Sequence, residues 1–366
     1  MVSNGIRVVV AMSGGVDSSV AAALLKTQGY DVIGLMLRLW GEPEAAGSVY
    51  NRCCSPDAVA QARRVAEQLD LPFYVLDAQA AFKQRVVDFF VDSYVAGVTP
   101  NPCLECNRHI RWEFLLNKAL ALDAAYLATG HYAQVRAVRE GAGTRYELLA
   151  GVDAQKDQSY VLSVMGQAQL QHALFPVGGY TKPEIRQIAR DHRLPVAERA
   201  ESQDLCFLAD NDYRRFLRDH AAAALRPGPI VRADGAIVGE HTGLANYTIG
   251  QRKGIGVTGP EALYVIGTLP ETNVLVVGPA EALGHDHLTA ARVNWVAGAP
   301  PAGPFRAQVK IRYKAAPAWA IVTPLPDGRV AVQFEARLRD ITPGQAAVFY
   351  DGAICLGGGI IQREAP

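Results

Sequence analysis

A glycine-rich turn near the N-terminus has the residue types that bind a phosphate chain. It is Ser13-Gly14-Gly15-Val16-Asp17-Ser18, between an apolar run and a helix-forming segment. Two adjacent glycines let backbone N–H groups converge on an anion, and the following helix adds the positive end of its dipole. Ser13 and Ser18 add hydroxyl donors, whereas Asp17 would repel a polyphosphate unless it holds a bridging Mg²⁺. The alternative is a turn that only joins a strand to a helix.

Cysteines form the second group with chemical potential. Cys103 and Cys106 lie in a proline-rich Thr-Pro-Asn-Pro-Cys-Leu-Glu-Cys-Asn segment, and Cys206 lies in Asp-Leu-Cys-Phe. A Cys-x-x-Cys pair at the opening of a helix favours thiolate, so one of these thiols could act as a nucleophile. The alternatives are inert thiols or half of a zinc site, and no second pair at zinc spacing follows. Cys53 and Cys54 are predicted to be incidental, although they could join a metal site, and Cys355 is predicted to be part of the core.

Alternating strands and helices must position the phosphate loop. The predicted strands are 8–10, 30–39, 73–77 and 125–129, and the predicted helices are 18–28, 55–69, 79–96 and 111–122. This alternation predicts a doubly wound parallel sheet of the α/β class, with its ligand at the carboxyl ends of the strands. Residues near such ends could meet an adenine, although ordinary packing is the alternative for each: Gly34, Met36, Leu37 and Gly130.

The second half of the chain changes character. Before this change, the sequence predicts a hairpin over 132–151 with a turn at 141–143. It then predicts a helix capped by Thr181 and Glu184 and a charged helix over 210–224. Asp-Gly turns then separate β-branched runs, which indicates mostly β structure. We predict a domain with the phosphate loop over 1–209, a small β-rich central domain over 210–282 and a C-terminal β-barrel domain over 283–366.

Composition limits the function classes. The chain has 366 residues, 49% of them hydrophobic, and a formal net charge of +0. It is long enough for two or three domains, and a nucleic-acid partner would need a local basic patch. No signal-type segment or membrane-length apolar run is present in the sequence, so we expect a cytoplasmic protein with no membrane partner.

Several motifs together resemble the bacterial tRNA-specific 2-thiouridylase family of the PP-loop ATP pyrophosphatase superfamily. They are AMSGGVDSSV, TPNPCLECN, ATGHY, KDQSYVL, CFL, GLANYTIGQRKGIG, KIRYK and ITPGQAAVFYDG, in family order. The resemblance implies that ATP adenylates the C2 oxygen of the wobble uridine in tRNAs for glutamate, glutamine and lysine. Sulfur from a relay protein then displaces the adenylate, giving 2-thiouridine, AMP and pyrophosphate. No DNA partner is implied.

The resemblance also implies roles for particular residues. Cys206 matches the persulfide-bearing cysteine, and Cys106 matches the second catalytic cysteine, which would form a disulfide with it as sulfur is released. Cys103 stands where some members carry aspartate, so a general-base role cannot be transferred to it. The implied target-base positions are Asn101, Pro102 and Cys103. The implied ATP-binding positions are Ala11, Met12, Ser13, Gly14, Gly15, Val16, Asp17 (with Mg²⁺), Ser18, Leu37 and Gly130. The implied tRNA contacts are His131, Lys156, Asp157, Gln158, Arg312, Tyr313 and Gln345.

A basic segment could follow a phosphate backbone. Lys310, Arg312 and Lys314 alternate, so on a strand they would project to one face. A solvated strand face is the alternative.

Other functions stay open at this stage. One is a PP-loop ligase that forms an amide or guanidine on a small molecule, and another is a non-enzymatic RNA-binding or redox module. Within the thiolase interpretation, Cys103, Cys106 and Cys206 could instead hold an iron–sulfur cluster.

Overall fold

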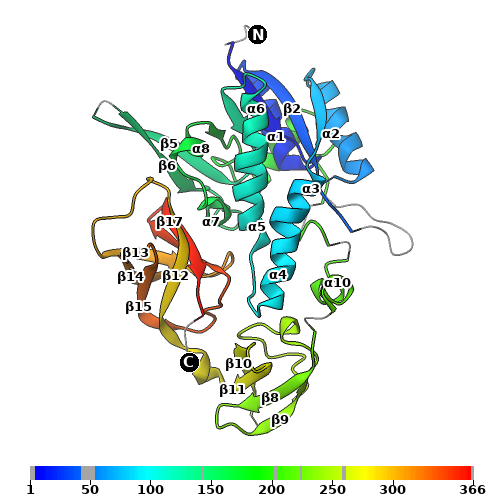
Figure 1. The fold of residues 1–366 in the computed structure, drawn as a ribbon. Helices are drawn as coiled ribbons and strands as arrows, with labels where there is room; N and C mark the ends of the chain where they lie inside the picture. Colours follow the sequence, from blue (N-terminus) through cyan, green and yellow to red (C-terminus); the bar gives the residue numbers. More distant parts are fainter. Residues whose placement is uncertain are drawn as a thin grey trace.

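The computed structural model describes residues 5–42, 54–141, 143–200, 205–208, 210–222, 225–257 and 261–363. Figure 1 shows a parallel sheet with helices, a barrel beside the long helices, and a small sheet at the end farthest from the N-terminus. The predicted fold class is therefore confirmed. The exact domain limits stay a prediction. No helix in these ranges is both long and apolar enough to cross a membrane.

The N-terminal sheet is parallel and has the strand order β3-β2-β1-β4-β7. Its strands are β1 (Arg7–Ala11), β2 (Asp31–Arg38), β3 (Phe73–Asp77), β4 (Tyr126–Ala128) and β7 (Ala173–Leu174). In the central strand β1, Val8 and Val10 pack into one core and Val9 into another. Successive side chains of a strand point to opposite faces, so this apolar run is covered on both sides.

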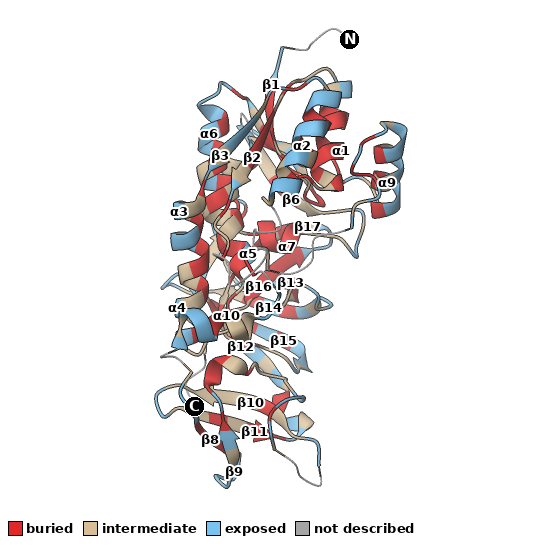
Figure 2. Cartoon of the chain, turned by 90° about the vertical axis from the view of Figure 1, so that its right-hand side faces the viewer, coloured by how far each residue is buried: buried red, intermediate tan, exposed pale blue. Residues whose placement is uncertain are grey.

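Helices cover both faces, as the alternation predicted. On the side of Val8 lie α1 (Val16–Thr27), α2 (Pro56–Gln68) and α9 (Lys182–Asp191). Figure 2 shows α2 and α9 with exposed residues on their outer faces. On the side of Val9 lies a continuous helix made of α5 (Pro102–Glu105), η2 (Cys106–Leu115) and α6 (Leu116–Leu120).

This helix starts nine residues before the predicted 111–122, so that prediction was wrong at its N-terminus. The prolines around Asn101 favour a loop when only the sequence is considered. Pro102 instead occupies the first helical position, and the Asn101 side chain accepts the Cys103 N–H at 3.1 Å. Both features favour a helix start because proline needs no N–H there and asparagine caps a free one. The helix predicted over 79–96 is present as α3 (Gln79–Phe82), η1 (Lys83–Asp88) and α4 (Phe89–Val95).

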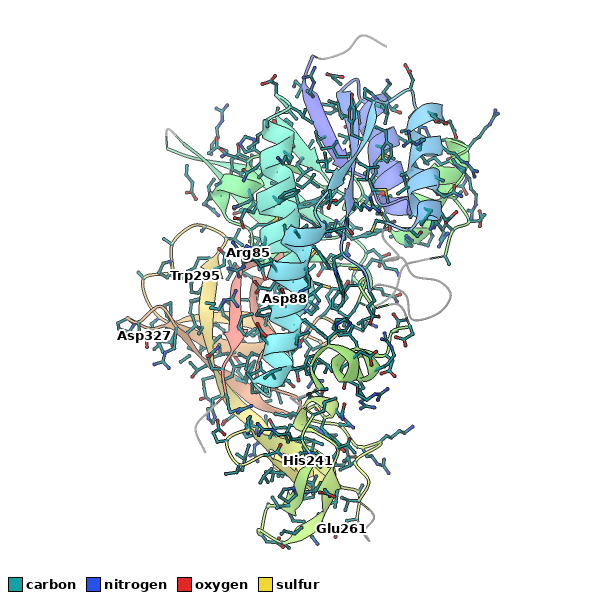
Figure 3. All side chains as sticks on the ribbon, turned by 45° about the vertical axis from the view of Figure 1, so that its right-hand side comes forward. Arg85, Asp88, His241, Glu261, Trp295 and Asp327 are labelled. Carbon is teal, nitrogen blue, oxygen red and sulfur yellow. The ribbon has the colours of Figure 1, made fainter. Side chains whose placement is uncertain are left out.

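The central domain is a four-stranded sheet in the order β10-β11-β8-β9. Its elements are β8 (Gly228–Arg232), β9 (Ile237–His241), η4 (Leu244–Asn246), β10 (Tyr264–Leu269), β11 (Val274–Gly278) and η5 (Ala280–Leu283). His241 lies buried among them (Figure 3). Its Nδ1 accepts the Gly243 N–H at 3.0 Å and its Nε2 lies 3.0 Å from the Asn273 carbonyl oxygen, so this imidazole links two loops.

Six strands form the C-terminal barrel, which closes because β12 pairs with both β15 and β17. They are β12 (His285–Trp295), β13 (Phe305–Lys310), β14 (Ala318–Pro324), β15 (Val330–Leu338), β16 (Ala346–Asp351) and β17 (Ile354–Ile361). The predicted hairpin is present as β5 (Ala133–Glu140) and β6 (Gly143–Ala150), although Ala142 of its turn lies outside the described residues. Unexpectedly, β6 joins the barrel sheet, pairing Leu148 with Cys355. The remaining helices are α7 (Ser159–Leu162), α8 (Gln167–Leu170) and α10 (Tyr213–His220).

The barrel also forms hydrogen bonds with the loop that leads into the helix at Pro102. The Thr99 N–H donates to the Pro343 carbonyl at 3.2 Å, and Gln345 Nε2 donates to the Thr99 carbonyl at 2.9 Å. Between these barrel residues, Gly344 has φ +91°, and a Cβ there would overlap Val98 Cγ1 and lie 2.7 Å from the Thr99 oxygen. Only glycine suits this junction.

We expect Gly344→Ala to lower the free energy of unfolding by about 3 kcal/mol, from the left-handed backbone together with the overlap. Gly352→Ala is the matched control, because Gly352 has φ +57° and a Cβ added there would meet no atom within 4 Å. The free energy of unfolding of Gly352→Ala should fall by only about 1 kcal/mol. Urea unfolding of both variants measures the difference, and equal losses would contradict the tight junction.

Candidate active site

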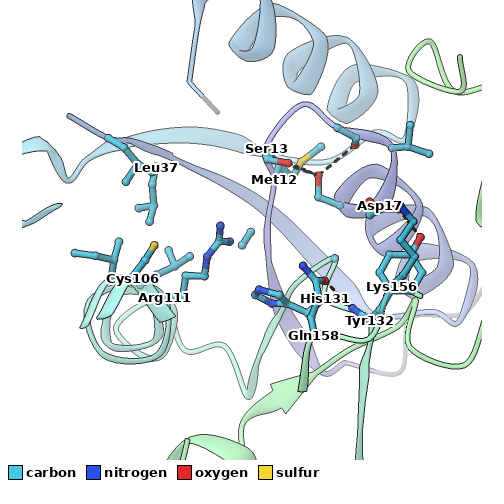
Figure 4. Close-up of a pocket in the computed structure, with 18 of the residues that line it drawn as sticks. Met12, Ser13, Asp17, Leu37, Cys106, Arg111, His131, Tyr132, Lys156 and Gln158 are labelled. Atoms are coloured by element: carbon cyan, nitrogen blue, oxygen red, sulfur yellow. Dashed lines mark hydrogen bonds between the residues drawn. The ribbon is translucent and has the colours of Figure 1, made fainter. Parts of the chain in front are cut away.

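One cavity of about 360 Å³ joins the phosphate loop to the helix that carries Cys106. This volume lies in the range of small-molecule sites. The cavity opens at the carboxyl ends of β1, β2 and β4, where a doubly wound sheet binds its ligand. All of the predicted ATP-binding residues except Gly14 line it. Figure 4 shows Cys106 and Arg111 on one wall, and Ser13 and Asp17 on another.

The phosphate loop is braced by its own side chains. The Ser13 N–H donates to Ser18 Oγ at 3.1 Å, and Ser18 Oγ donates to the Gly15 carbonyl at 3.3 Å. Gly14 has φ +71° and faces the backbone of Ala58 in α2, which explains why it does not line the cavity. A Cβ at Gly130 would lie 2.7 Å from the Ser18 nitrogen, so this glycine permits the close approach of the β4 loop to α1.

Asp17, the predicted metal ligand, lies beside a buried lysine. Asp17 Oδ1 accepts from Lys182 Nζ at 2.7 Å and from the Tyr132 hydroxyl at 2.7 Å. Lys182 is 8% exposed and lines the cavity. Mg²⁺ is commonly held by one or two carboxylates together with substrate phosphates, so a single carboxylate on a phosphate loop fits that ion.

Sequence reasoning missed Lys182 as a site residue, because the pattern from Thr181 to Glu184 indicates only a helix start. The start itself is confirmed, since the Thr181 N–H donates to Glu184 at 2.7 Å. A lysine in the first turn of a helix opposes the helix dipole, and that misplacement was the available signal. Arg111 and Arg199, which also line the cavity, were missed as well.

The structure separates the cysteines into different environments. Cys106 lines the cavity, whereas Cys103 is exposed at the start of the same helix. Cys106 and Cys206 both pack against one hydrophobic cluster that contains Phe82, Phe90 and Phe207. Their separate segments therefore converge on the same region of the molecule.

Cys355 and Cys54 are not among the residues that line the cavity. Cys355 is fully buried in β17, as predicted, and burial raises its thiol pKa to about 12. Cys54 Sγ lies 3.4 Å from the Leu39 nitrogen, and Cys53 lies outside the described residues. Within the described ranges, no three His, Cys, Asp or Glu side chains are grouped so that they could hold a metal ion. The iron–sulfur alternative on Cys103, Cys106 and Cys206 therefore has no support in this arrangement.

Several of the implied tRNA contacts meet at the cavity. His131, Lys156 and Gln158 all line it. His131 is buried with Nδ1 2.8 Å from Thr129 Oγ1, and burial together with the nearby Arg111 lowers its pKa well below the usual range. Asp157 instead organises its own loop, accepting the N–H groups of Gly151 at 3.1 Å and Ser159 at 3.0 Å.

The prediction that Lys310, Arg312 and Lys314 share a strand face was wrong. Strand β13 ends at Lys310, and the Ala315 N–H donates to the Arg312 carbonyl at 3.1 Å to close a turn. Arg312 Nη2 donates to the Ile249 carbonyl at 3.2 Å and to Thr342 Oγ1. Arg312 thus links the central domain to the barrel, and its burial lowers the pKa of the guanidinium.

The same turn carries Tyr313 into the cavity wall, where it meets Tyr160 edge-on at 6.0 Å between ring centroids. Gln345, another implied tRNA contact, is instead occupied by the carbonyls of Thr99 and Pro100. Of the implied tRNA contacts Arg312, Tyr313 and Gln345, Tyr313 lines the cavity and the other two do not.

Family models match three consecutive segments of the chain. Residues 6–210 match the tRNA methyl transferase HUP domain, residues 214–279 the tRNA methyl transferase PRC-barrel domain, and residues 285–361 the aminomethyltransferase beta-barrel domain. The tRNA-specific 2-thiouridylase MnmA of Chloroflexus aggregans is 49% identical over 357 residues, covering 98% of each chain. The protein of the same name from Heliobacterium modesticaldum is 50% identical over 359 residues, covering 98% of this chain and 92% of the relative. The chain belongs to the tRNA-specific 2-thiouridylase family.

Proposed function

We propose that this protein is an ATP-dependent tRNA-uridine 2-sulfurtransferase. It adenylates the C2 oxygen of the wobble uridine and replaces that oxygen with sulfur, releasing AMP and pyrophosphate. The observation that carries the proposal is the cavity lined by both the phosphate loop and Cys106. Its substrates are the tRNAs for glutamate, glutamine and lysine, its sulfur comes from a relay protein as persulfide, and it works in the cytoplasm.

In the first step, the loop from Ser13 to Ser18 binds the phosphate chain of ATP through its N–H groups and the start of α1. Lys182 and Arg199 add positive charge on this side of the cavity. Mg²⁺, held by Asp17, would neutralise charge on the departing pyrophosphate. The uridine oxygen attacks the α-phosphorus, and the bond between the α-phosphorus and the bridging oxygen breaks.

In the second step, Cys106 attacks Sγ of the Cys206 persulfide as a thiolate. A disulfide forms between the two cysteines, and the terminal sulfur leaves with its electron pair as hydrosulfide. That sulfur bonds to C2, and AMP leaves with the electrons of the C2–O bond. The disulfide is then reduced by an external dithiol before another turnover.

The remaining implied contacts surround this chemistry. Asn101, Pro102 and Cys103 form the first turn of the helix next to the cavity wall, where the target base would enter. His131, Lys156, Gln158 and Tyr313 line the cavity itself. An aromatic ring such as Tyr313 can stack on an unpaired base.

Exchange of labelled pyrophosphate into ATP tests the proposed function. Exchange should require one of the three tRNAs, and 2-thiouridine should form when a persulfide donor is added. Exchange that needs no tRNA would instead favour a ligase acting on a small molecule.

Asp17→Asn should reduce pyrophosphate exchange at least about 100-fold, because loss of the charge weakens Mg²⁺ binding at the phosphates. Binding of tRNA, measured by filter retention, should change less than about twofold, since the change lies in the phosphate loop. Asp70→Asn is the control: Asp70 is exposed with φ 52°, a conformation that asparagine tolerates. Normal exchange by Asp17→Asn would remove this residue from the metal site.

Cys106→Ser and Cys206→Ser should each abolish 2-thiouridine formation and keep pyrophosphate exchange, because sulfur transfer follows adenylation. Cys103→Asp should stay active, since some family members carry aspartate at that position. Mass spectrometry of the Cys106→Ser variant, loaded with a sulfur donor, should find one added sulfur on Cys206. An added sulfur on Cys103, or an inactive Cys103→Asp beside an active Cys106→Ser, would reverse the assignment.

A further inference from the structure

A π-helical segment brings a positively charged side chain, that of Arg111, to the cavity beside Cys106. The helix residues that line the cavity are Cys106, Ile110, Arg111 and Leu115. In an α-helix, residues five apart point about 140° away from each other, so Cys106 and Arg111 would not share a wall. Here they lie in the π-helical segment η2, and the Leu116 N–H bonds to the Arg111 carbonyl, five residues back. The π-helical hydrogen bonding thus accounts for both side chains reaching one cavity.

Arg111 reaches the cavity from the wall opposite Lys182 and Arg199. Lys182 Nζ lies 2.7 Å from Asp17, and Arg199 Nη1 lies 3.1 Å from the Gly14 carbonyl, so both belong to the side of the phosphate loop. Figure 4 shows Arg111 extending from the Cys106 helix toward that loop and His131. Its guanidinium therefore carries positive charge between the sulfur chemistry and the phosphate loop.

We propose that Arg111 contacts the α-phosphoryl group throughout the reaction, an inference that rests on the proposed function. The planar guanidinium presents two parallel N–H donors, which match two phosphoryl oxygens. The α-phosphoryl group is the one part of ATP that remains between the loop and the uridine after pyrophosphate has left. A cation on the Cys106 wall can therefore serve both steps.

The charge moves in a defined way. As the uridine O2–phosphorus bond forms, the α–β bond breaks, pyrophosphate takes the electron pair, and the N3 proton passes to water. When hydrosulfide bonds to C2, the C2–O bond breaks, AMP takes the electron pair, and the sulfur-bound proton returns to N3. In both steps, negative charge is carried by the α-phosphoryl oxygens, where a fixed guanidinium stabilises it.

We expect Arg111→Gln to lower the kcat of tRNA-dependent pyrophosphate exchange by about 10²- to 10³-fold. The KM for ATP should change less than about threefold, because most of the phosphate chain is bound by the loop. Arg111→Lys should recover part of the rate, since lysine keeps the positive charge but lacks the two parallel N–H donors of the guanidinium. The control is Lys118→Gln, an exposed cation at the end of the same helix, which should be unchanged.

Phosphorothioate ATP separates direct contact from a structural role. The unmodified protein should prefer one diastereomer of ATP that carries sulfur on the α-phosphorus, and Arg111→Gln should lose at least about tenfold of that preference. A structural defect would slow both diastereomers equally. An unchanged diastereomer preference in Arg111→Gln, or exchange within twofold of the unmodified protein, would overturn the proposed role of Arg111. Either result would leave the proposed function standing.

Thermal unfolding of each variant accompanies these assays. Should Arg111→Gln fail to fold, Arg111→Lys supports the same comparison. Loss of the two parallel N–H donors should also weaken the preference for one diastereomer. An unmodified protein without any tRNA-dependent exchange would instead overturn the proposed function.

Discussion

A buried carboxylate between Cys103 and Cys106 joins the N-terminal domain to the barrel. Glu105, 3% exposed, accepts from Arg292 Nη2 at 3.0 and 3.1 Å and lies 3.3 Å from His109 Nε2. Arg292 comes from an irregular point of β12, where its φ is 51°. The Arg292 side chain is 47% exposed, so solvent screens this pair, and the cost of separating it falls mainly on Glu105, whose buried charge would lose its partner on the barrel. The start of the helix therefore cannot move away from the barrel without that cost.

This attachment explains how one cavity can be built from distant segments. Gln345 holds the loop before the helix by donating to two backbone carbonyls, and Tyr313 enters the cavity from the turn that follows β13. The hairpin strand β6 continues the barrel sheet and leads into the segment that supplies Lys156 and Gln158. The barrel thus contributes to the site both directly and by fixing the helix that carries Cys106.

What the sequence could predict was local. The phosphate loop depends on neighbouring residues and on one strand-to-helix junction, and the structure has that junction where the pattern predicted it. Lys182 and Arg111 depend on contacts across the fold: the first meets Asp17, 165 positions earlier, and the second relies on a π-helical segment that no propensity pattern marks. Basic residues at alternate positions after Val309 favoured a strand, but the chain beyond Lys310 has no pairing partner in either β14 or β16.

The placement of positive charge is also consistent with cleavage between the α- and β-phosphates. Cleavage at that bond leaves two anions that must be held apart, pyrophosphate on the loop and the adenylate toward the sulfur. The cavity has cations on both sides of such a division, with Lys182 and Arg199 near the loop and Arg111 beside Cys106. A site with cations only at the loop would hold the departing pyrophosphate and leave the adenylate charge unsupported while sulfur attacks. In the proposed mechanism, the cations near the loop would hold pyrophosphate during adenylation, and Arg111 would hold the adenylate during sulfur transfer.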